Sequence, residues 1–229
     1  LLIAESQMMK ETEDVVHMSL DFLPLKSYAN ITEGNALRLD WPRTDYIMGN
    51  PPFVGYSLQS KAQKDDILSI YVDEKGKPYK TAGKIDYVSG WYFKAAQLMQ
   101  GTAIRTAFVS TNSITQGEQV AGVWKPLYER FGIHIDFAHR TFRWDSEASL
   151  KAHVHCVIVG FSIAPNSAEK VLFTSNRAET VNNLNAYLVE ADTVFIESRN
   201  KPVSNVPILQ NGGKPTEGGF LILTEEEKE

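Results

Sequence analysis

The residues best suited to chemistry are Asn50, Pro51, Pro52 and Phe53, which directly follow the apolar stretch 45–49. Two consecutive prolines fix φ near about −65° and remove two backbone donors, and each proline pushes the residue before it toward extended geometry. The carbonyl groups of Asn50 and Pro51 are therefore predicted to point outward, beside a side-chain amide and an aromatic ring. Acceptors next to a stacking surface suit a planar ligand that carries an exocyclic amino group.

Two prolines in a row can also do nothing more than end a strand. In this chain the preceding strand is apolar, Gly49 and Asn50 stand directly before the prolines, and an aromatic ring follows them. This combination favours a functional site. The stretch 49–53 resembles the catalytic motif of amino-methyltransferases that use S-adenosylmethionine, which reads Asn or Asp, two prolines, then Tyr or Phe. The resemblance implies that these acceptor oxygens hold an amino group while it receives a methyl group.

Strands and helices that alternate along the chain are predicted to hold this motif in place. Buried strands of this kind predict a largely parallel, doubly wound α/β sheet, and two late strands joined only by a loop predict an antiparallel pair. Residues 54–83 are predicted to form a long polar loop and residues 140–144 a basic loop. Strands are expected at 27–33, 45–49, 103–109, 133–138, 152–161, 170–174 and 193–197, and helices at 1–17, 84–99, 118–131 and 182–190.

The carboxyl ends of the parallel strands are the expected place of the site, because open α/β sheets bind their ligands there. Asn35, Asn50, Asn112 and Phe142 follow predicted strands at that edge and are expected to converge. On sequence alone Asn35 is equally compatible with a turn, and Phe142 and Trp144 are equally compatible with the core.

Two groups of basic residues are expected on the same rim as the motif. Lysine in a loop is more often solvated than in contact with nucleic acid, so it is their position that favours a DNA contact. The net charge of −5 argues against DNA binding over the whole surface. An acidic body with a basic rim suits a catalytic module whose main DNA-binding parts lie elsewhere. The two groups are Lys75, Lys77, Lys80 and Lys84, and His139, Arg140 and Arg143.

The overall composition bounds the fold and the compartment. With 229 residues and 43% hydrophobic content, one large domain, or one domain with an appendage, is expected around a real core. The single cysteine excludes an intrachain disulfide and fits a reducing compartment, which predicts a cytoplasmic protein. No apolar run approaches the roughly 18 residues that a membrane span needs, so no membrane association is predicted.

Other reactive side chains do not form a recognisable catalytic group. His153 and His155 share one face of a predicted strand, but a closed metal site needs four convergent ligands, so no metal site is predicted. Cys156 lies in an apolar strand and is predicted to be a packed thiol rather than a nucleophile. The hydroxyl residues Ser110 and Ser113 near Asn112 lack a paired base, which argues against hydrolytic catalysis.

Six segments together carry a more specific resemblance than any single motif. They are 34–37, 49–53, 86–92, 108–119, 137–144 and 154–161. In these segments, and over roughly residues 1–205, the chain resembles the MmeI-like family of adenine methyltransferases of the gamma order. Members of that family are large bacterial proteins that fuse restriction and modification activities.

The resemblance implies a class I, Rossmann-like methyltransferase sheet, largely parallel with an antiparallel last strand. It also implies S-adenosylmethionine as the cofactor. Asn35 and Ala36 match the family position that meets the adenine of the cofactor, and Asn50 is expected to contact the cofactor as well.

The implied partner is double-stranded DNA with a flipped adenine, because the target base must leave the duplex stack to reach the acceptor oxygens. Phe53 is the expected stacking surface for that base, and Phe142 would stack from the other side or form the pocket wall. Arg140, Arg143 and Asn112 are expected to contribute further contacts to the DNA.

One departure from the family pattern affects the expected domain organisation. Such proteins carry a Gly-rich loop and an acidic residue that bind the cofactor, and neither is found upstream of Asn35. Residues 1–165 are therefore expected to be the C-terminal portion of a catalytic domain, truncated at its N-terminal side. Residues 166–200 would add accessory strands and a helix, and 201–229 would form a linker or tail toward a target-recognition domain. The target-recognition and nuclease modules are expected on the same parent chain.

The predicted function is site-specific DNA adenine N6-methylation from S-adenosylmethionine, within a restriction-modification protein. Two alternatives stay open on the sequence. The first is another amino-methyltransferase, acting on RNA or on a protein amide, which would use the same pair of prolines. The second is a folded fragment that is catalytically inactive, since the chain lacks the expected cofactor loop and is itself expected to be inactive.

Overall fold

The computed structural model describes residues 31–144, 154–165, 168–175, 177–199 and 204–205. By its internal contacts the chain divides into two units, residues 1–40 and residues 41–229. The predicted helix at 1–17 and most of the tail at 201–229 lie outside the described residues. The described part of the predicted strand at 27–33, residues 31–33, has no strand structure.

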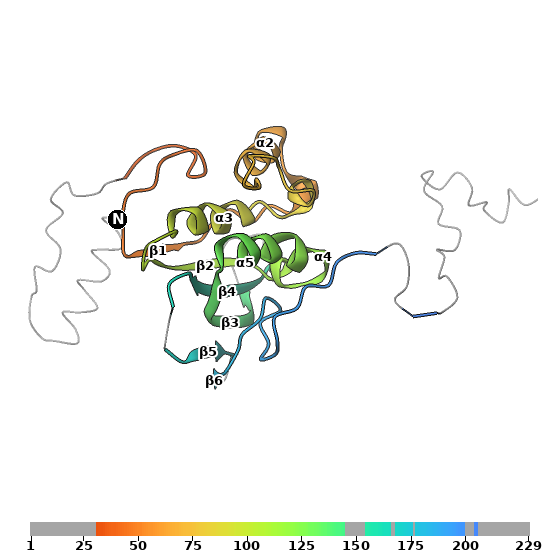
Figure 1. The fold of residues 1–229 in the computed structure, drawn as a ribbon. Coiled ribbons are helices and arrows are strands. Elements are labelled where there is room, and N and C mark those ends of the chain that lie inside the picture. The colour runs from red at the N-terminus through yellow and green to blue at the C-terminus, as the bar shows by residue number, and fades with distance from the viewer. Residues whose placement is uncertain (1–30, 145–153, 166–167, 176, 200–203, 206–229) are drawn as a thin grey trace, which may run out of the picture. The chain divides into compact units, whose positions relative to one another are not determined.

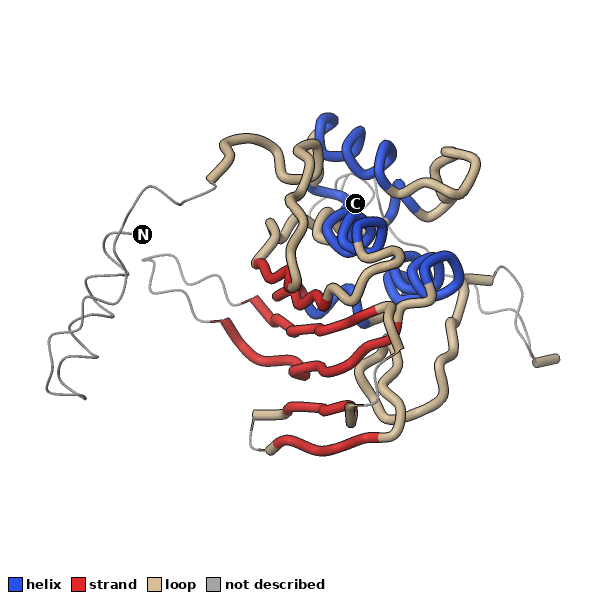
Figure 2. Tube along the Cα trace, turned by 60° about the vertical axis from the view of Figure 1, so that its left-hand side comes forward, coloured by secondary structure: helices blue, strands red, loops and turns tan. Residues whose placement is uncertain are grey.

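The second unit is built on one six-stranded sheet (Figures 1 and 2). Its spatial order is β1-β2-β4-β3-β5-β6. The strands are β1 (Tyr46–Gly49), β2 (Arg105–Thr111), β3 (His134–Trp144), β4 (Val154–Ser162), β5 (Lys170–Phe173) and β6 (Ala178–Val181).

The directions of the strands confirm the predicted class of fold. β1 and β2 are parallel, as are β3 and β5, whereas β4 is antiparallel to both β2 and β3 and β6 is antiparallel to β5. Four strands (β1, β2, β3 and β5) therefore run in one direction and two run in the other. The late strand β4 is inserted antiparallel between β2 and β3, as expected for a class I methyltransferase sheet.

The helices near the sheet are α2 (Lys61–Ile70), α3 (Ser89–Leu98), α4 (Gly117–Gln119) and α5 (Lys125–Phe131), with a π-helical turn, η4 (Val120–Trp124), between the last two. The predicted helix at 118–131 contains Pro126 because a new helix, α5, begins there after the π-helical turn. Pro126 lies at the start of α5, where no intrahelical donor is needed. Gly132 ends the helix with a left-handed backbone, φ 66°.

The core between α3 and the sheet is aromatic. The ring of Tyr92 on α3 lies 5.1 Å from that of Phe108, 5.2 Å from Trp124 and 5.3 Å from Phe161, measured between centroids. Its hydroxyl is 2.8 Å from Ser110 Oγ on β2. Burial raises the pKa of the Tyr92 hydroxyl, so the group stays protonated and available for this hydrogen bond. The neighbouring strands β2 and β4, which carry Phe108 and Phe161, are thus fixed from one face.

One helix of the structure, α2, was not predicted. The predicted polar loop at 54–83 contains α2, so the prediction of a continuous loop is wrong. Ser60 begins the helix with a capping box: its hydroxyl accepts the N–H of Gln63 at 3.3 Å, and the Gln63 side chain accepts the N–H of Ser60 at 2.9 Å. The pattern Ser-x-x-Gln is a helix start signal that outweighs the polar composition of the segment.

The basic segment 140–144 is also not a loop. β3 continues through it to Trp144 and pairs with β4, Phe142 opposite Cys156 and Trp144 opposite Val154. A register shift between His139 and Phe142 accommodates one extra residue on β3. Such a bulge lets one strand carry an unpaired residue without leaving the sheet. The charged composition of the segment gives no sign of this pairing.

The region after residue 165 agrees only partly with the prediction. β5 confirms the strand at 170–174 and joins the main sheet through β3, but β6 was missed. The expected helix at 182–190 is a set of turns, and the described residues 193–197 form no strand. Asn185 explains the first difference, because its side-chain oxygen accepts the N–H of Tyr187 at 3.0 Å and its carbonyl accepts the N–H of Leu188 at 2.9 Å. Asparagine competes in this way with helical hydrogen bonds.

Two observations on the described residues bear on partners. No helix among them has the length and apolar character to cross a membrane. Nor do they contain a group of three or more His, Cys, Asp or Glu side chains placed to hold a metal ion. Cys156 is fully buried, as predicted for a packed thiol, whereas His153 lies outside the described part of the chain.

Candidate active site

The motif at 50–53 leaves the sheet at the carboxyl end of β1. Gly49, the last residue of the strand, pairs with Phe108 of β2. Asn50 is exposed, Pro51 is buried and Phe53 is half-buried. In the described part of the chain, no hydrogen bond involves the Asn50 side chain or the Pro51 carbonyl. The Asn50 side chain is therefore open to solvent, whereas Pro51 is buried, and contact of both oxygens with a ligand stays a prediction.

The chain that follows Phe53 is held in place by the segment before α3. The N–H of Tyr87 donates to the Val54 carbonyl at 2.9 Å, and the Gln59 side chain donates to the Ile85 carbonyl at 2.9 Å. Gln59 is 8% exposed, so this anchor is shielded from water. The motif thus lies between a strand and an anchored loop, which limits its movement.

Asn112 follows β2, the parallel neighbour of β1, and lies at the same edge of the sheet. Its side-chain oxygen accepts hydrogen bonds from Thr141 Oγ1 at 2.8 Å and from Thr115 Oγ1 at 3.1 Å. Thr141 belongs to β3, so this amide joins β3 to the turn after β2. A cavity of about 320 Å³ adjoins it and is lined by Asn112, Thr115, Gln116, Gly117, Arg140, Thr141, Tyr187 and Leu188.

The structure brings Asn112 and Arg140 to one cavity, but Phe142 and Arg143 do not line it. Phe142 is half-buried, and its ring meets that of His139 edge-on at a centroid distance of 5.1 Å. It pairs with Cys156, which also pairs with Thr111 at the end of β2. Phe142 therefore lies level with the carboxyl end of β2, and the exposed Arg143 follows it.

Asn35 and Ala36 belong to the first unit of the chain. The side-chain oxygen of Asn35 accepts the N–H of Leu37 at 2.9 Å, and its carbonyl accepts those of Arg38 and Leu39 at 2.8 and 3.0 Å. Asn35 thus forms a turn, which was one of its two interpretations. Its contact with the cofactor stays a prediction.

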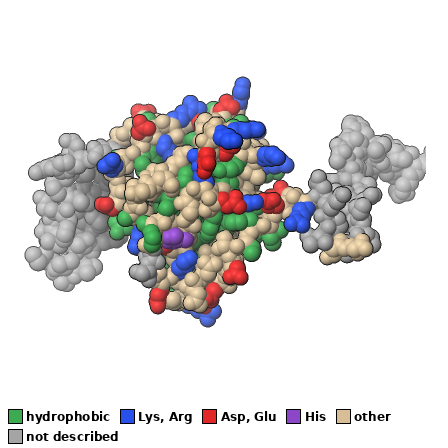
Figure 3. All heavy atoms as spheres, viewed as in Figure 1, with side chains coloured by type: hydrophobic (Ala, Val, Ile, Leu, Met, Phe, Trp, Pro, Cys, Tyr) green, Lys and Arg blue, Asp and Glu red, His purple; other side chains and the backbone are tan. Residues whose placement is uncertain are grey.

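The two basic groups do not share one cavity. Arg140 lines the cavity at Asn112, whereas Lys80 and Lys84 line another, of about 500 Å³, together with Lys125 and acidic residues. Figure 3 shows Lys and Arg interspersed with Asp and Glu over the face that it presents, rather than gathered in one patch. The two groups therefore do not line one cavity, and their common place on the rim beside the motif stays a prediction.

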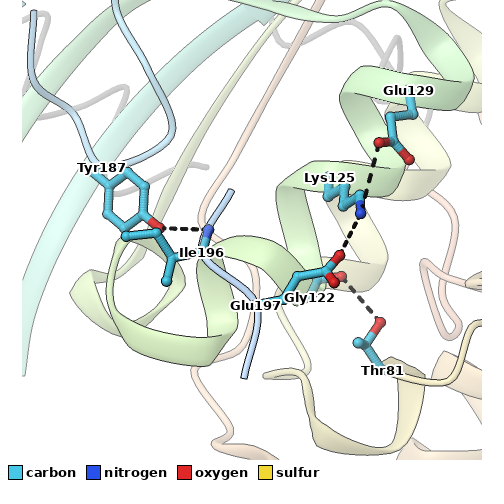
Figure 4. Close-up of polar contacts among 7 residues, drawn as sticks. All are labelled: Thr81, Gly122, Lys125, Glu129, Tyr187, Ile196 and Glu197. Carbon is cyan, nitrogen blue, oxygen red and sulfur yellow. Dashed lines mark hydrogen bonds and ion pairs between the residues drawn. The ribbon is translucent and has the colours of Figure 1, made fainter. Parts of the chain in front are cut away.

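Ion pairs between Lys125 and nearby glutamates account for part of this interspersed arrangement of basic and acidic side chains. Lys125 forms an ion pair with Glu197 and lies 3.9 Å from Glu129 (Figure 4). The N–H of Ile196 donates to the Tyr187 hydroxyl at 3.3 Å. These contacts attach the extended segment to α5 and place carboxylates among the lysines, which lowers the local positive charge.

Three comparisons relate this chain to known proteins. The family model described as the MmeI DNA-methyltransferase domain matches residues 1–174. DNA methyltransferase A of Bacillus subtilis (strain 168) is 39% identical over 233 residues, which cover 98% of this chain and 26% of that protein. The solved structure of the type IIL restriction-modification enzyme MmeI in complex with DNA is 42% identical, with a TM-score of 0.83, and the match covers 97% of this chain and 30% of that one. The chain thus spans less than a third of the length of either relative.

Proposed function

Because this chain belongs to the MmeI DNA-methyltransferase domain family, we propose that it is part of a restriction-modification protein that methylates the N6 amino group of adenine in double-stranded DNA. The methyl donor would be S-adenosylmethionine. The observation that carries the proposal is the motif at 50–53, with an exposed Asn50 at the carboxyl end of β1 and a half-buried Phe53 after two prolines.

The acceptor oxygens explain how the motif would activate an aromatic amine. Such an amine is a poor nucleophile, because its lone pair is delocalised into the ring. If the Asn50 side-chain oxygen and the Pro51 carbonyl accept its two N–H groups, the nitrogen is drawn toward tetrahedral geometry and the lone pair becomes available. The prolines hold both oxygens in place, so positioning and electrostatics supply the rate without a strong base.

The oxygen atoms of the motif suit the charge of the proposed cofactor. S-adenosylmethionine, when bound, would supply a methyl group from its positively charged sulfur to the nitrogen lone pair: the N–C bond forms as the C–S bond breaks, and S-adenosylhomocysteine leaves as a neutral thioether. Amide and carbonyl oxygens such as those of Asn50 and Pro51 complement such a charge and need no metal. By the family resemblance, Asn35 and Ala36 would meet the adenine of the cofactor. Asn50 would also contact the cofactor but would contribute little to its affinity.

The remaining candidate residues would bind the extruded base and the DNA around it. Phe53 would stack on the base, and aromatic stacking is worth roughly 1–3 kcal/mol per base. Phe142 would stack from the other side or form the pocket wall. Arg140 and Asn112, which line one cavity, and the exposed Arg143 would contact the DNA near it.

The wider organisation follows from the family. We propose that a target-recognition domain and a nuclease module lie on the same parent chain, with residues 1–165 in the catalytic domain and 201–229 in a linker. The parent protein would act in the bacterial cytoplasm, where its DNA substrate is found.

The proposal is tested with the full-length parent protein, labelled S-adenosylmethionine and duplex DNA. The expected result is label in the DNA, recovered as N6-methyladenine after digestion and mass spectrometry. Recovery as N4-methylcytosine would overturn the adenine assignment, and label in RNA or protein alone would overturn the substrate class.

Replacing Phe53 by alanine is expected to weaken capture of the flipped base, because the stacking surface is lost. With 2-aminopurine at the target position, the rise in fluorescence on binding should largely disappear, in line with a loss of roughly 1–3 kcal/mol. The control is Phe53→Tyr, which keeps the ring and should keep the signal. An undiminished rise in Phe53→Ala would contradict the stacking role.

A further inference from the structure

The side chain of Asp86 contacts the segments that leave both β1 and β2. The residue lies just before α3 and is 6% exposed. Charged groups are seldom buried to this extent unless they are paired or hydrogen-bonded. No motif in the sequence points to Asp86, although it begins one of the segments that carry the family resemblance.

The first contact of Asp86 is to the chain that follows the motif. Its Oδ1 accepts the N–H of Tyr56 at 3.0 Å. The next residue, Tyr87, donates its own N–H to the Val54 carbonyl at 2.9 Å. Two hydrogen bonds from consecutive residues thus fix the short stretch directly after Phe53.

The second contact of Asp86 is to the turn that follows β2. Its Oδ2 accepts a hydrogen bond from the hydroxyl of Ser113, which belongs to the turn Asn112–Thr115. The same hydroxyl oxygen lies 2.8 Å from Thr111 Oγ1 at the end of β2. One carboxyl group therefore bridges the segments that carry Asn50 and Asn112.

The backbone of Asp86 is itself fixed by α4. Its N–H donates to Gln119 Oε1 at 3.0 Å, and the amide nitrogen of Gln119 donates to the Lys84 carbonyl at 2.7 Å. The side-chain amide of Gln119 thereby holds the chain on both sides of Ile85. Because the backbone of Asp86 is held in this way, its carboxyl group can set the position of the loops that it binds.

We propose that Asp86 is a positioning residue for methyl transfer, which fixes the motif at 50–53 against the turn at 112–115. The inference rests on the proposed function of that motif. Asp86 acts through the loops and touches no reacting atom. Its contribution would be geometric, because a displacement of about 1 Å at a reacting group can cost roughly 100-fold in rate.

The test uses the full-length parent protein and three measurements on each variant: kcat for methyl transfer to duplex DNA, the Kd of S-adenosylmethionine, and the melting temperature. Asp86→Ala removes both contacts and is expected to lower kcat by roughly 10- to 100-fold, with Kd within about twofold of wild type. Ser113→Ala removes only the contact to the turn after β2 and should give a smaller loss, of roughly three- to tenfold in kcat.

Asp86→Asn provides the rescue by a conservative change. Its side-chain oxygen can accept the N–H of Tyr56, and its amide nitrogen can donate to Ser113 Oγ, since a hydroxyl can also accept. Its kcat should lie within about threefold of wild type. The matched control is Asp136→Ala, which removes a carboxyl group bonded to His134 Nδ1 at 2.9 Å at the start of β3. That change should lower the melting temperature but leave kcat unchanged.

The outcomes separate the inference from the function on which it rests. A wild-type protein that methylates no DNA would refute the proposed function, and the inference with it. With an active wild type, a normal kcat in Asp86→Ala, or an equal loss of kcat in Asp136→Ala, would refute the positioning role alone. If Asp86→Ala does not fold, Ser113→Ala decides, because wild-type kcat in that variant would overturn the inference.

Discussion

Replacing Asn50 by alanine in the full-length parent protein is expected to lower the rate of methyl transfer by roughly 10²–10³-fold, the cost of removing one preorganised polar group from a reacting centre. The side chain is the acceptor proposed to draw the amine toward tetrahedral geometry. Because Asn50 is exposed, the substitution should change the free energy of unfolding by less than about 0.5 kcal/mol. Single-turnover transfer of labelled methyl groups to duplex DNA measures the effect.

The affinity for S-adenosylmethionine separates this role from simple binding. If Asn50 acts on the amine, its loss should leave the Kd of the cofactor within about twofold of wild type, because the interaction is stronger in the transition state than in the ground state. The control is Asn50→Asp, which keeps an acceptor oxygen and matches the residue that the family motif also allows. Unchanged turnover in Asn50→Ala would contradict the assigned role.

Much of the fold was predictable because its signals are local. β1 and β2 end in polar residues after apolar stretches, and in β2 the buried Thr106, Phe108 and Ser110 alternate with more exposed neighbours. This alternation of burial follows from the two faces of a strand, whereas in the sequence the signal was the short apolar stretch itself. The position of Asn50 and Asn112 at one edge then follows from the parallel pairing of the two strands.

The parts that were not predicted depend on contacts between distant residues. Asp86 meets Tyr56, 30 residues before it, and Ser113, 27 residues after it. Neither pairing leaves a periodic signal in the sequence. The extension of β3 beyond His139 likewise depends on its pairing with β4, which overrides the charged composition of the segment. The start of α2 is different, since its capping box at Ser60 was readable.

The turn that carries Asn112 depends on one buried side chain. Trp124 is fully buried. Its Nε1 donates to the Ile114 carbonyl at 2.8 Å, and its ring packs edge-on against Tyr92. Ile114 lies in the turn after β2. Trp124 thus connects the helical layer to the edge of the sheet at which the candidate site lies.

Replacing Trp124 by alanine is expected to lower the free energy of unfolding by roughly 3–5 kcal/mol, the usual cost of removing a large aromatic side chain from a core. Trp124→Phe keeps a ring but leaves the Ile114 carbonyl without its donor, so its loss should be nearer to 1–3 kcal/mol, or about the cost of one unsatisfied buried acceptor. Urea unfolding of the chain, followed by circular dichroism, measures both. An unfolding midpoint equal to wild type in Trp124→Ala would show that this side chain does not support the fold, and the turn at 112–115 would then need another anchor.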